Sequence, residues 1–136
     1  MTPVHFLDHT ADLGIEVTEP SLGDLLITIG NVIFDYQVKG PRAETRTISI
    51  ECQSDSFEDL LVDWCRELLY NFSVHGFIPM VYTLAIHDLS LAAELRGDTF
   101  DKKRHCVKTE IKNVTYHDLI VEKTKIGYRA VVVFDV

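Results

Sequence analysis

The strongest helix pattern in the chain lies at residues 56–76, which read SFEDLLVDWCRELLYNFSVHG. Large apolar side chains recur there three and four residues apart, the spacing of one face of an α-helix. They are Phe57, Leu60, Leu61, Trp64, Cys65, Leu68, Leu69 and Phe72. Ser56 before this pattern and Gly76 after it are residue types that begin and end helices. We therefore expect an amphipathic helix between them, at the centre of the core.

A second amphipathic pattern precedes that helix. Its apolar residues have the same spacing and are Leu22, Leu25, Leu26, Ile29, Val32, Ile33 and Tyr36. Ser21, followed three residues later by Asp24, is similar to a capping box, and residues 39–41 (KGP) are a stop signal. We expect a helix from about Ser21 to Tyr36.

Extended segments occupy most of the remaining chain. Residues 44–52 alternate apolar and polar side chains, the period of a strand with one buried face. Segments rich in β-branched and aromatic residues follow the second helix, at residues 80–87, 89–96, 109–119 and 128–136. Two shorter ones, 4–7 and 14–17, flank a polar turn near the start. These patterns predict an α+β fold of two layers, with two main helices packed on a largely antiparallel sheet.

Length and composition are typical of a single domain, here residues 1–136. No apolar run approaches the roughly 20 residues that cross a bilayer, and the N-terminus lacks the pattern of a signal peptide. We therefore expect a cytoplasmic protein without membrane contact. Cys52, Cys65 and Cys106 match neither a disulfide framework nor a CxxC motif, so we expect buried, reduced thiols.

The charge balance limits the partners of the protein. The formal net charge is -8 and the isoelectric point is near 5.1. On average such a surface repels phosphate backbones, so direct, high-affinity binding to DNA or RNA is not expected. A role in RNA metabolism would be indirect, through a partner whose own surface is basic.

Two acidic segments from opposite ends of the sequence make the candidate site. Asp8, His9 and Asp12 lie in the N-terminal polar turn, and Asp135 and Val136 end an apolar strand. At a strand end, the Asp135 side chain and the terminal carboxylate of Val136 can face a neighbouring loop. Oxygen ligands suit calcium or magnesium better than zinc. The alternative, a solvated acidic terminus, is the more common case for such residues.

Histidine and lysine positions leave further alternatives open. His5 and His9 are four residues apart, but they lie in extended segments without an HExxH arrangement, which disfavours zinc. Lys112 is either a point charge for phosphate or a solvated strand residue. The GxxxxGK[ST], GxGxxG and GxSxG motifs are missing from the sequence, and this weakens the case for an autonomous enzyme.

Four segments resemble the archease family, in the family's order. They are HTADLG at 9–14, DLLVDW at 59–64, Lys112-x-x-Thr115-Tyr116-His117, and VFDV at 133–136. The similarity spans essentially the whole chain, and four signatures in register are far more specific than one. The sequence departs from the pattern at Asn113, where the family usually has a small apolar residue, and this change could alter how the strand packs.

The resemblance implies both a fold and a function. The fold is a strand-helix-strand-strand unit that carries an inserted second unit. Family members are accessory proteins, not enzymes, of the GTP-dependent RtcB-type ligase that joins RNA ends in tRNA splicing and RNA repair. They promote guanylylation of the ligase, allow multiple turnover and broaden its nucleotide use, so RNA would be met only through the ligase.

The resemblance also implies site residues. A divalent cation, calcium with magnesium or manganese as alternatives, would be held by Asp12, Asp135 and Val136. Lys112 matches a functionally important lysine of the family, which acts in the complex with the ligase.

Two other functions remain open. A general chaperone or protein-interaction module would bind clients through an exposed surface, and its acidic site would be structural only. An autonomous metal-dependent hydrolase would use Asp8, Asp12 and Asp135 as ligands with His9 as base, and it would turn over without a partner.

Overall fold

Both helices begin at the serines that the sequence indicates. The computed structural model describes residues 4–7 and 12–136. Helix α1 spans Leu22–Gln37, and the Ser21 hydroxyl accepts a hydrogen bond from the Asp24 amide at 3.1 Å. Helix α2 spans Phe57–His75, and Ser56 caps it in the same way through the Asp59 amide at 3.0 Å. Each serine satisfies an amide of the first helical turn that has no partner within the helix.

Helix α2 ends where a glycine allows the chain to reverse. Gly76 has a φ of 66°, in the left-handed region, and its amide donates back to the carbonyl of Phe72 at 2.9 Å. This conformation is unstrained for glycine and ends helices commonly. The chain can therefore turn directly from α2 into the strand that starts at Phe77.

The strands form two main antiparallel sheets and a short ribbon. The four-stranded sheet has the order β1 (Val4–Leu7), β2 (Asp12–Glu19), β9 (Tyr128–Asp135) and β8 (Asn113–Lys123). The three-stranded sheet has the order β4 (Arg46–Gln53), β6 (Ser90–Thr99) and β5 (Phe77–His87). Strands β3 (Val38–Lys39) and β7 (Cys106–Val107) pair as the ribbon.

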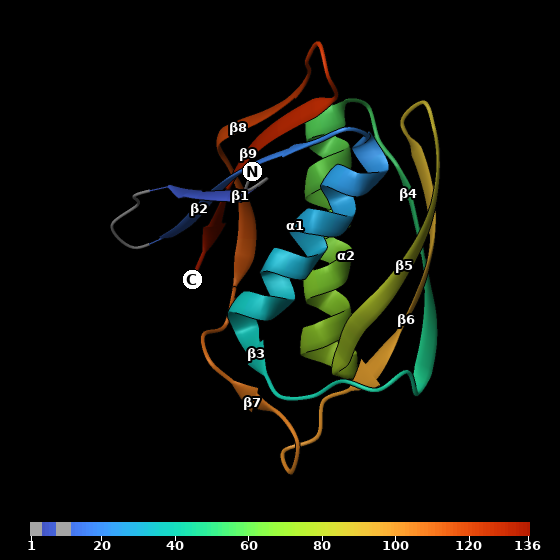
Figure 1. The fold of residues 1–136 in the computed structure, drawn as a ribbon, viewed down its shortest axis with the longest axis vertical. Helices are drawn as coiled ribbons and strands as arrows, with labels where there is room; N and C mark the ends of the chain where they lie inside the picture. Colours follow the sequence, from blue (N-terminus) through green and yellow to red (C-terminus); the bar gives the residue numbers. More distant parts are fainter. Residues whose placement is uncertain (1–3, 8–11) are drawn as a thin grey trace.

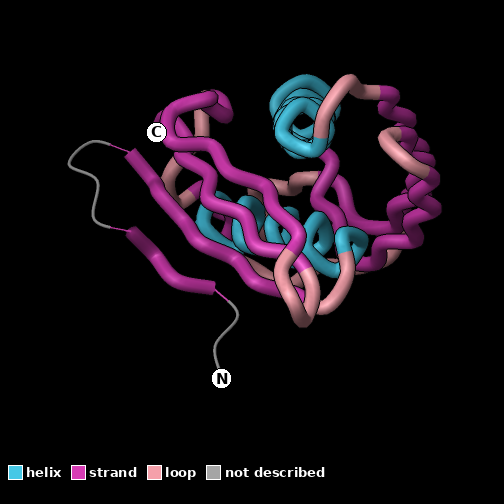
Figure 2. Tube along the Cα trace, turned by 90° about the horizontal axis from the view of Figure 1, so that it is seen from above, coloured by secondary structure: helices cyan, strands magenta, loops and turns pink. Residues whose placement is uncertain are grey.

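The helix pair lies between the two main sheets (Figures 1 and 2). Helix α1 contacts β2 and β9 on one side and β5 on the other, and α2 contacts β8 as well as β4 and β5. The α+β class, with two helices packed on antiparallel sheets, is confirmed. The division into separate sheets differs from the single sheet that we expected, because strand periodicity does not reveal which strands pair.

Helix α2 supplies the centre of the core, as its sequence predicted. Trp64 is completely buried, and its indole nitrogen donates to the carbonyl of Leu26 in α1 at 2.9 Å. The hydrogen bond satisfies the only polar atom of this side chain, so the ring can be buried without an unpaired donor. Trp64 thereby joins the two helices at their interface.

The cysteines are only partly as expected. All three are free, but Cys65 is buried, Cys52 is half-buried and Cys106 is exposed. The expectation that every thiol is buried is therefore wrong for Cys106. This residue lies in the β3–β7 ribbon opposite the exposed Lys39, whereas the neighbouring Val38 of the ribbon is buried in the core.

Candidate functional site

The two acidic ends of the sequence meet in the four-stranded sheet. Asp12 at the start of β2 is the direct antiparallel partner of Asp135 at the end of β9. Their neighbours Leu13 and Phe134 are buried in the core. Because successive side chains of a strand point to opposite faces, both aspartates lie on the outer face of the sheet. Both are exposed, and directly opposed residues on one face are close enough to share a ligand.

Strand β8 completes this rung on the other side of Asp135. Asn113 is the β8 partner of Asp135, and the Lys112 amide donates to the Asp135 carbonyl at 2.8 Å. Val136 follows Asp135 and packs partly against the core. The structure thus brings Asp12, Asp135, Val136 and Lys112 to one end of the four-stranded sheet, with β9 in the middle.

The donor atoms at this end suit a hard cation. Two carboxylates and the main-chain oxygen of Val136 are oxygen ligands, which calcium and magnesium prefer. Within residues 4–7 and 12–136, no group of three or more His, Cys, Asp or Glu side chains is placed to hold a metal. A cation bound here would therefore keep several waters, as such ions often do. Asp8 and His9 lie outside the described residues.

Asn113 does not disturb the packing of its strand. Its side chain is exposed, and its amide oxygen accepts a hydrogen bond from the Val114 amide at 2.9 Å. The neighbouring Val114 fills the core position and is 3% exposed. The departure from the family pattern therefore falls on the outer face, beside the aspartates, where a polar side chain is readily solvated.

A contact between α2 and β8 was not evident from the sequence. The Tyr116 hydroxyl donates to Asp59 at 2.9 Å, and the Arg66 guanidinium lies over the Tyr116 ring. The Asp59 hydrogen bond raises the pKa of the Tyr116 hydroxyl. Strand β8 has an irregular register between Thr115 and Ile120, so its backbone pairing with β9 is interrupted there. The contact secures this interrupted part of β8 next to the site.

The histidines that the structure describes do not join the aspartate rung. His5 pairs with Glu16 in the register of β1 and β2, away from Asp12. His105 is buried, where its Nδ1 accepts from the Asp101 amide at 2.9 Å and its Nε2 lies 2.7 Å from the Pro41 carbonyl. His105 is thus held by main-chain groups of two connecting segments and by the buried Asp98, whose carboxylate lies 3.4 Å from Nε2.

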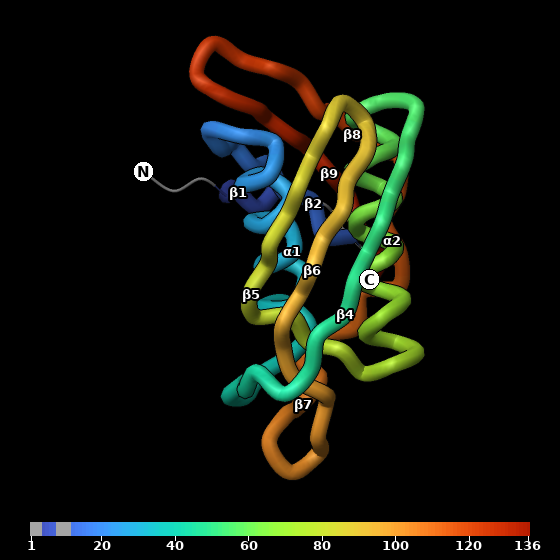
Figure 3. Tube along the Cα trace, turned by 90° about the vertical axis from the view of Figure 1, so that its right-hand side faces the viewer, coloured from blue at the N-terminus to red at the C-terminus, as the bar shows by residue number. Residues whose placement is uncertain are grey.

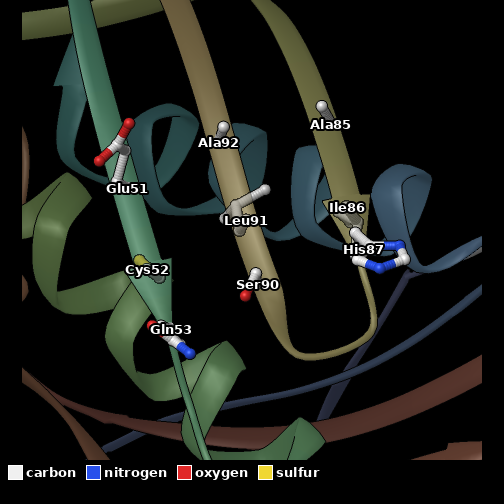
Figure 4. A pocket seen from close by; sticks show the side chains of 9 residues that line it. All are labelled: Glu51, Cys52, Gln53, Ala85, Ile86, His87, Ser90, Leu91 and Ala92. Atoms are coloured by element: carbon white, nitrogen blue, oxygen red, sulfur yellow. The ribbon is translucent and has the colours of Figure 1, made fainter.

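A depression of about 540 Å³ lies on the other main sheet (Figure 4). Glu51 and Gln53 come from β4, Ser90 and Ala92 from the central β6, and His87 from β5. The polar side chains among them are separated by apolar ones such as Ile86 and Leu91 and do not converge on a common point. The depression is therefore a shallow part of a sheet surface and is separate from the aspartate rung.

Comparison with known proteins now adds to this geometry. The model of the Archease protein family (MTH1598/TM1083) matches residues 5–136. The chain belongs to the archease family. Protein archease of Archaeoglobus fulgidus is 34% identical, with 96% of this chain and 97% of the relative covered. Protein archease of Methanosarcina barkeri is 33% identical, with 96% and 94% covered.

Two solved structures have the archease fold seen here. The solution structure of Methanobacterium thermoautotrophicum protein 1598 superposes with a TM-score of 0.66, at 24% identity and full coverage of both chains. The crystal structure of a Thermotoga maritima archease, described as a possible chaperone, gives a TM-score of 0.64 at 22% identity, with 96% and 94% covered. At these identities the likeness establishes the fold.

The helices of the described residues are also informative about membranes. None of them combines the length and the apolar character that a membrane-spanning helix requires.

Proposed function

We propose that this archease is a cytoplasmic accessory activator of a GTP-dependent RtcB-type RNA ligase. In this role it promotes guanylylation and multiple turnover of the ligase and broadens its nucleotide use, without being an enzyme itself. The observation that carries the proposal is the rung on which Asp12 and Asp135 are direct partners, with the main-chain amide of Lys112 bonded to the Asp135 carbonyl. Oxygen ligands and a lysine at one exposed strand end suit phosphate chemistry on a partner protein.

We propose separate roles for the residues of the rung. Asp12, Asp135 and an oxygen of Val136 would hold a divalent cation, with calcium favoured and magnesium or manganese as alternatives. Such a cation supplies positive charge that offsets the charge of phosphates during nucleotidyl transfer. Lys112 is exposed and adds a point charge on the same edge of the sheet. Because these groups lie at the surface, they can be presented to a nucleotide bound by another protein.

Charge-neutral, isosteric variants test the cation site. Asp12→Asn and Asp135→Asn should each weaken Ca²⁺ binding by about tenfold or more in calorimetric titration, because calcium affinity follows the charge of its ligands. Both variants should keep the unfolding free energy within about 0.5 kcal/mol of the wild type, since the side chains are exposed. Asp88→Asn is the matched control, because Asp88 is an exposed aspartate in the turn before β6.

A ligation assay with the cognate ligase tests the function. Under multiple-turnover conditions, Asp12→Asn, Asp135→Asn and Lys112→Ala should lose most of the stimulation, whereas Asp88→Asn and Lys125→Ala should retain it. Full stimulation by all three site variants would remove the assigned site. Turnover of RNA or nucleotide by the archease alone would instead support the hydrolase alternative.

A general chaperone is the second candidate, favoured by the description of the Thermotoga maritima relative as a possible chaperone. This function needs a client-binding surface and no cation. Suppression of client aggregation that is equal for wild type and Asp12→Asn, combined with unchanged ligase stimulation, would favour the chaperone.

A further inference from the structure

One end of this acidic protein is strongly basic. Most of the 13 lysines and arginines fall in residues 39–46 and 96–112, although the whole chain has a net charge of -8. We define the basic end by the side chains of two connecting segments near β3 and β7. They are Lys39, Arg42, Lys102, Lys103, Arg104 and Lys108. Figures 1 and 3 show that these segments lie together below the two sheets.

The β3–β7 ribbon brings the two segments together. Lys39 pairs with Cys106 in its register, and the Lys108 amide donates to the Gln37 carbonyl at 2.7 Å. Lys39, Arg42 and Lys108 line an open depression of about 570 Å³. Two segments far apart in the sequence therefore give three cationic side chains to one hollow, which is also lined by the Asp35 carboxylate that pairs with Arg42.

The carboxylates of this end pair with arginines and leave several lysines without an ion-pair partner. Buried Asp98 accepts from Arg104 at 2.7 Å, and Asp35 accepts from Arg42 at 3.2 Å. In the part of the chain that the structure describes, none of Lys39, Lys102, Lys103 and Lys108 has a carboxylate within ion-pair distance. These lysines give this end a local excess of positive charge, although the whole chain has a net charge of -8.

We propose that the basic end binds the phosphate backbone of RNA. The choice of RNA over an acidic protein rests on the proposed function. A ligase surface attracted to the acidic remainder of this protein is itself basic and is repelled by the basic end. The phosphates of the RNA held by that ligase have the complementary charge.

The shape and position of the basic end agree with binding to the phosphate backbone of RNA. The lining of the depression has no aromatic ring, so it offers charge to phosphates but no surface for stacking bases. Residues 108–112 lead directly from this end to Lys112 at the aspartate rung. One RNA–ligase complex can therefore meet both surfaces. Because few phosphates are contacted, binding is weak and salt-sensitive, in accord with the low affinity for nucleic acid expected from the net charge.

Direct binding tests this proposal without the ligase. Fluorescence anisotropy of a labelled oligouridylate is measured with the full chain at low ionic strength and then across a salt series. The double variant Lys39→Glu/Lys108→Glu should bind about tenfold more weakly than wild type. A plot of log K against log salt concentration should have a slope that is smaller in magnitude by about 1.4 for this variant, because two contacts to single-strand phosphates are lost.

The control has the same change in net charge at another place. Lys123→Glu/Lys125→Glu alters exposed lysines at the β8–β9 turn and should bind RNA at least about threefold more tightly than the basic-end variant. Equal loss in both variants, no binding by wild type, or binding of polyglutamate in place of RNA would each overturn the proposal. Thermal melts establish that both variants are folded. Failure of ligase stimulation with RNA binding intact would count against the proposed function only.

Discussion

At the scale of single residues, Asp98 is the one carboxylate that is buried among the described residues. It is 1% exposed and accepts hydrogen bonds from Arg104, from the Ala43 amide at 3.0 Å and from the Thr99 amide at 2.8 Å. These donors join β6 to two connecting segments. The Arg104 hydrogen bond is the largest influence and holds the pKa of the Asp98 carboxyl well below its usual range, despite the opposing effect of burial.

Asp98→Asn should lower the unfolding free energy by about 2 kcal/mol in urea unfolding at neutral pH, because an amide nitrogen would replace an acceptor facing buried donors. Asp55→Asn is the control and should change it by less than about 0.5 kcal/mol, since Asp55 is exposed in the loop before α2. Equal effects of the two variants would show that Asp98 has no special role.

The lowered pKa of Asp98 also predicts how its contribution to the unfolding free energy changes with pH. The ionised Asp98 stabilises the fold fully above the unfolded-state value of about 3.9, and the stabilisation is lost as pH falls from there toward the lower folded-state pKa. The difference in unfolding free energy between wild type and Asp98→Asn should therefore be constant above about pH 5 and shrink below about pH 4. A difference that grows on acidification would contradict the assigned cause.

At the scale of elements, the decisive contact is between α2 and the irregular part of β8. Tyr116 bonds to Asp59, and the Val121 amide donates to Glu58 at 3.3 Å, so the N-terminal part of α2 holds both sides of the irregularity. Helix contacts here replace backbone pairing that β9 does not supply. This contact also links two segments of the family pattern, 59–64 and 112–117.

Tyr116→Phe should loosen this part of β8 locally. Amide hydrogen exchange of residues 115–121 should become faster, while global stability changes by less than about 1 kcal/mol, because a single exposed hydrogen bond is lost. Tyr70→Phe is the matched control, since both tyrosines are 54% exposed and Tyr70 lies on α2, the helix that carries Asp59. Unchanged exchange in β8 would show that the hydrogen bond does not hold the strand.

At the scale of the whole molecule, the layered arrangement sets the reactivity of the cysteines. Cys65 lies between the layers and is fully buried, and burial raises its pKa strongly. Burial is also the main reason that the pKa of the half-buried Cys52 rises to about 11. Cys106 is exposed on the β3–β7 ribbon, which belongs to neither main sheet.

A thiol reagent such as Ellman's reagent should therefore react rapidly with one cysteine of the native protein at neutral pH. Cys106→Ser should abolish the fast phase, whereas Cys52→Ser should leave it intact, because thiolate content and access control the rate. Complete unfolding should expose all remaining thiols. A fast phase that survives in Cys106→Ser would contradict the burial of the other two cysteines.

Much of the secondary structure was predictable because its causes are local. The caps Ser21 and Ser56 act on amides three residues away, and the apolar stripes of both helices repeat within each turn. Strand boundaries were less accurate. Strand β8 runs from Asn113 to Lys123, where the sequence indicated 109–119, because its irregular register and its helix contacts have no period in the sequence.

The candidate site depends on both levels of structure. The residue types at 12, 112, 135 and 136, and the likeness to archeases around them, are properties of the sequence and identify acidic and basic groups suited to a cation and to phosphate. Their meeting depends on strand order, since β9 pairs with β2 on one side and β8 on the other. The basic end likewise requires the pairing of β3 with β7. Such pairings join residues far apart in the chain and are selected by burial of the whole core, so periodicity within one segment does not contain them.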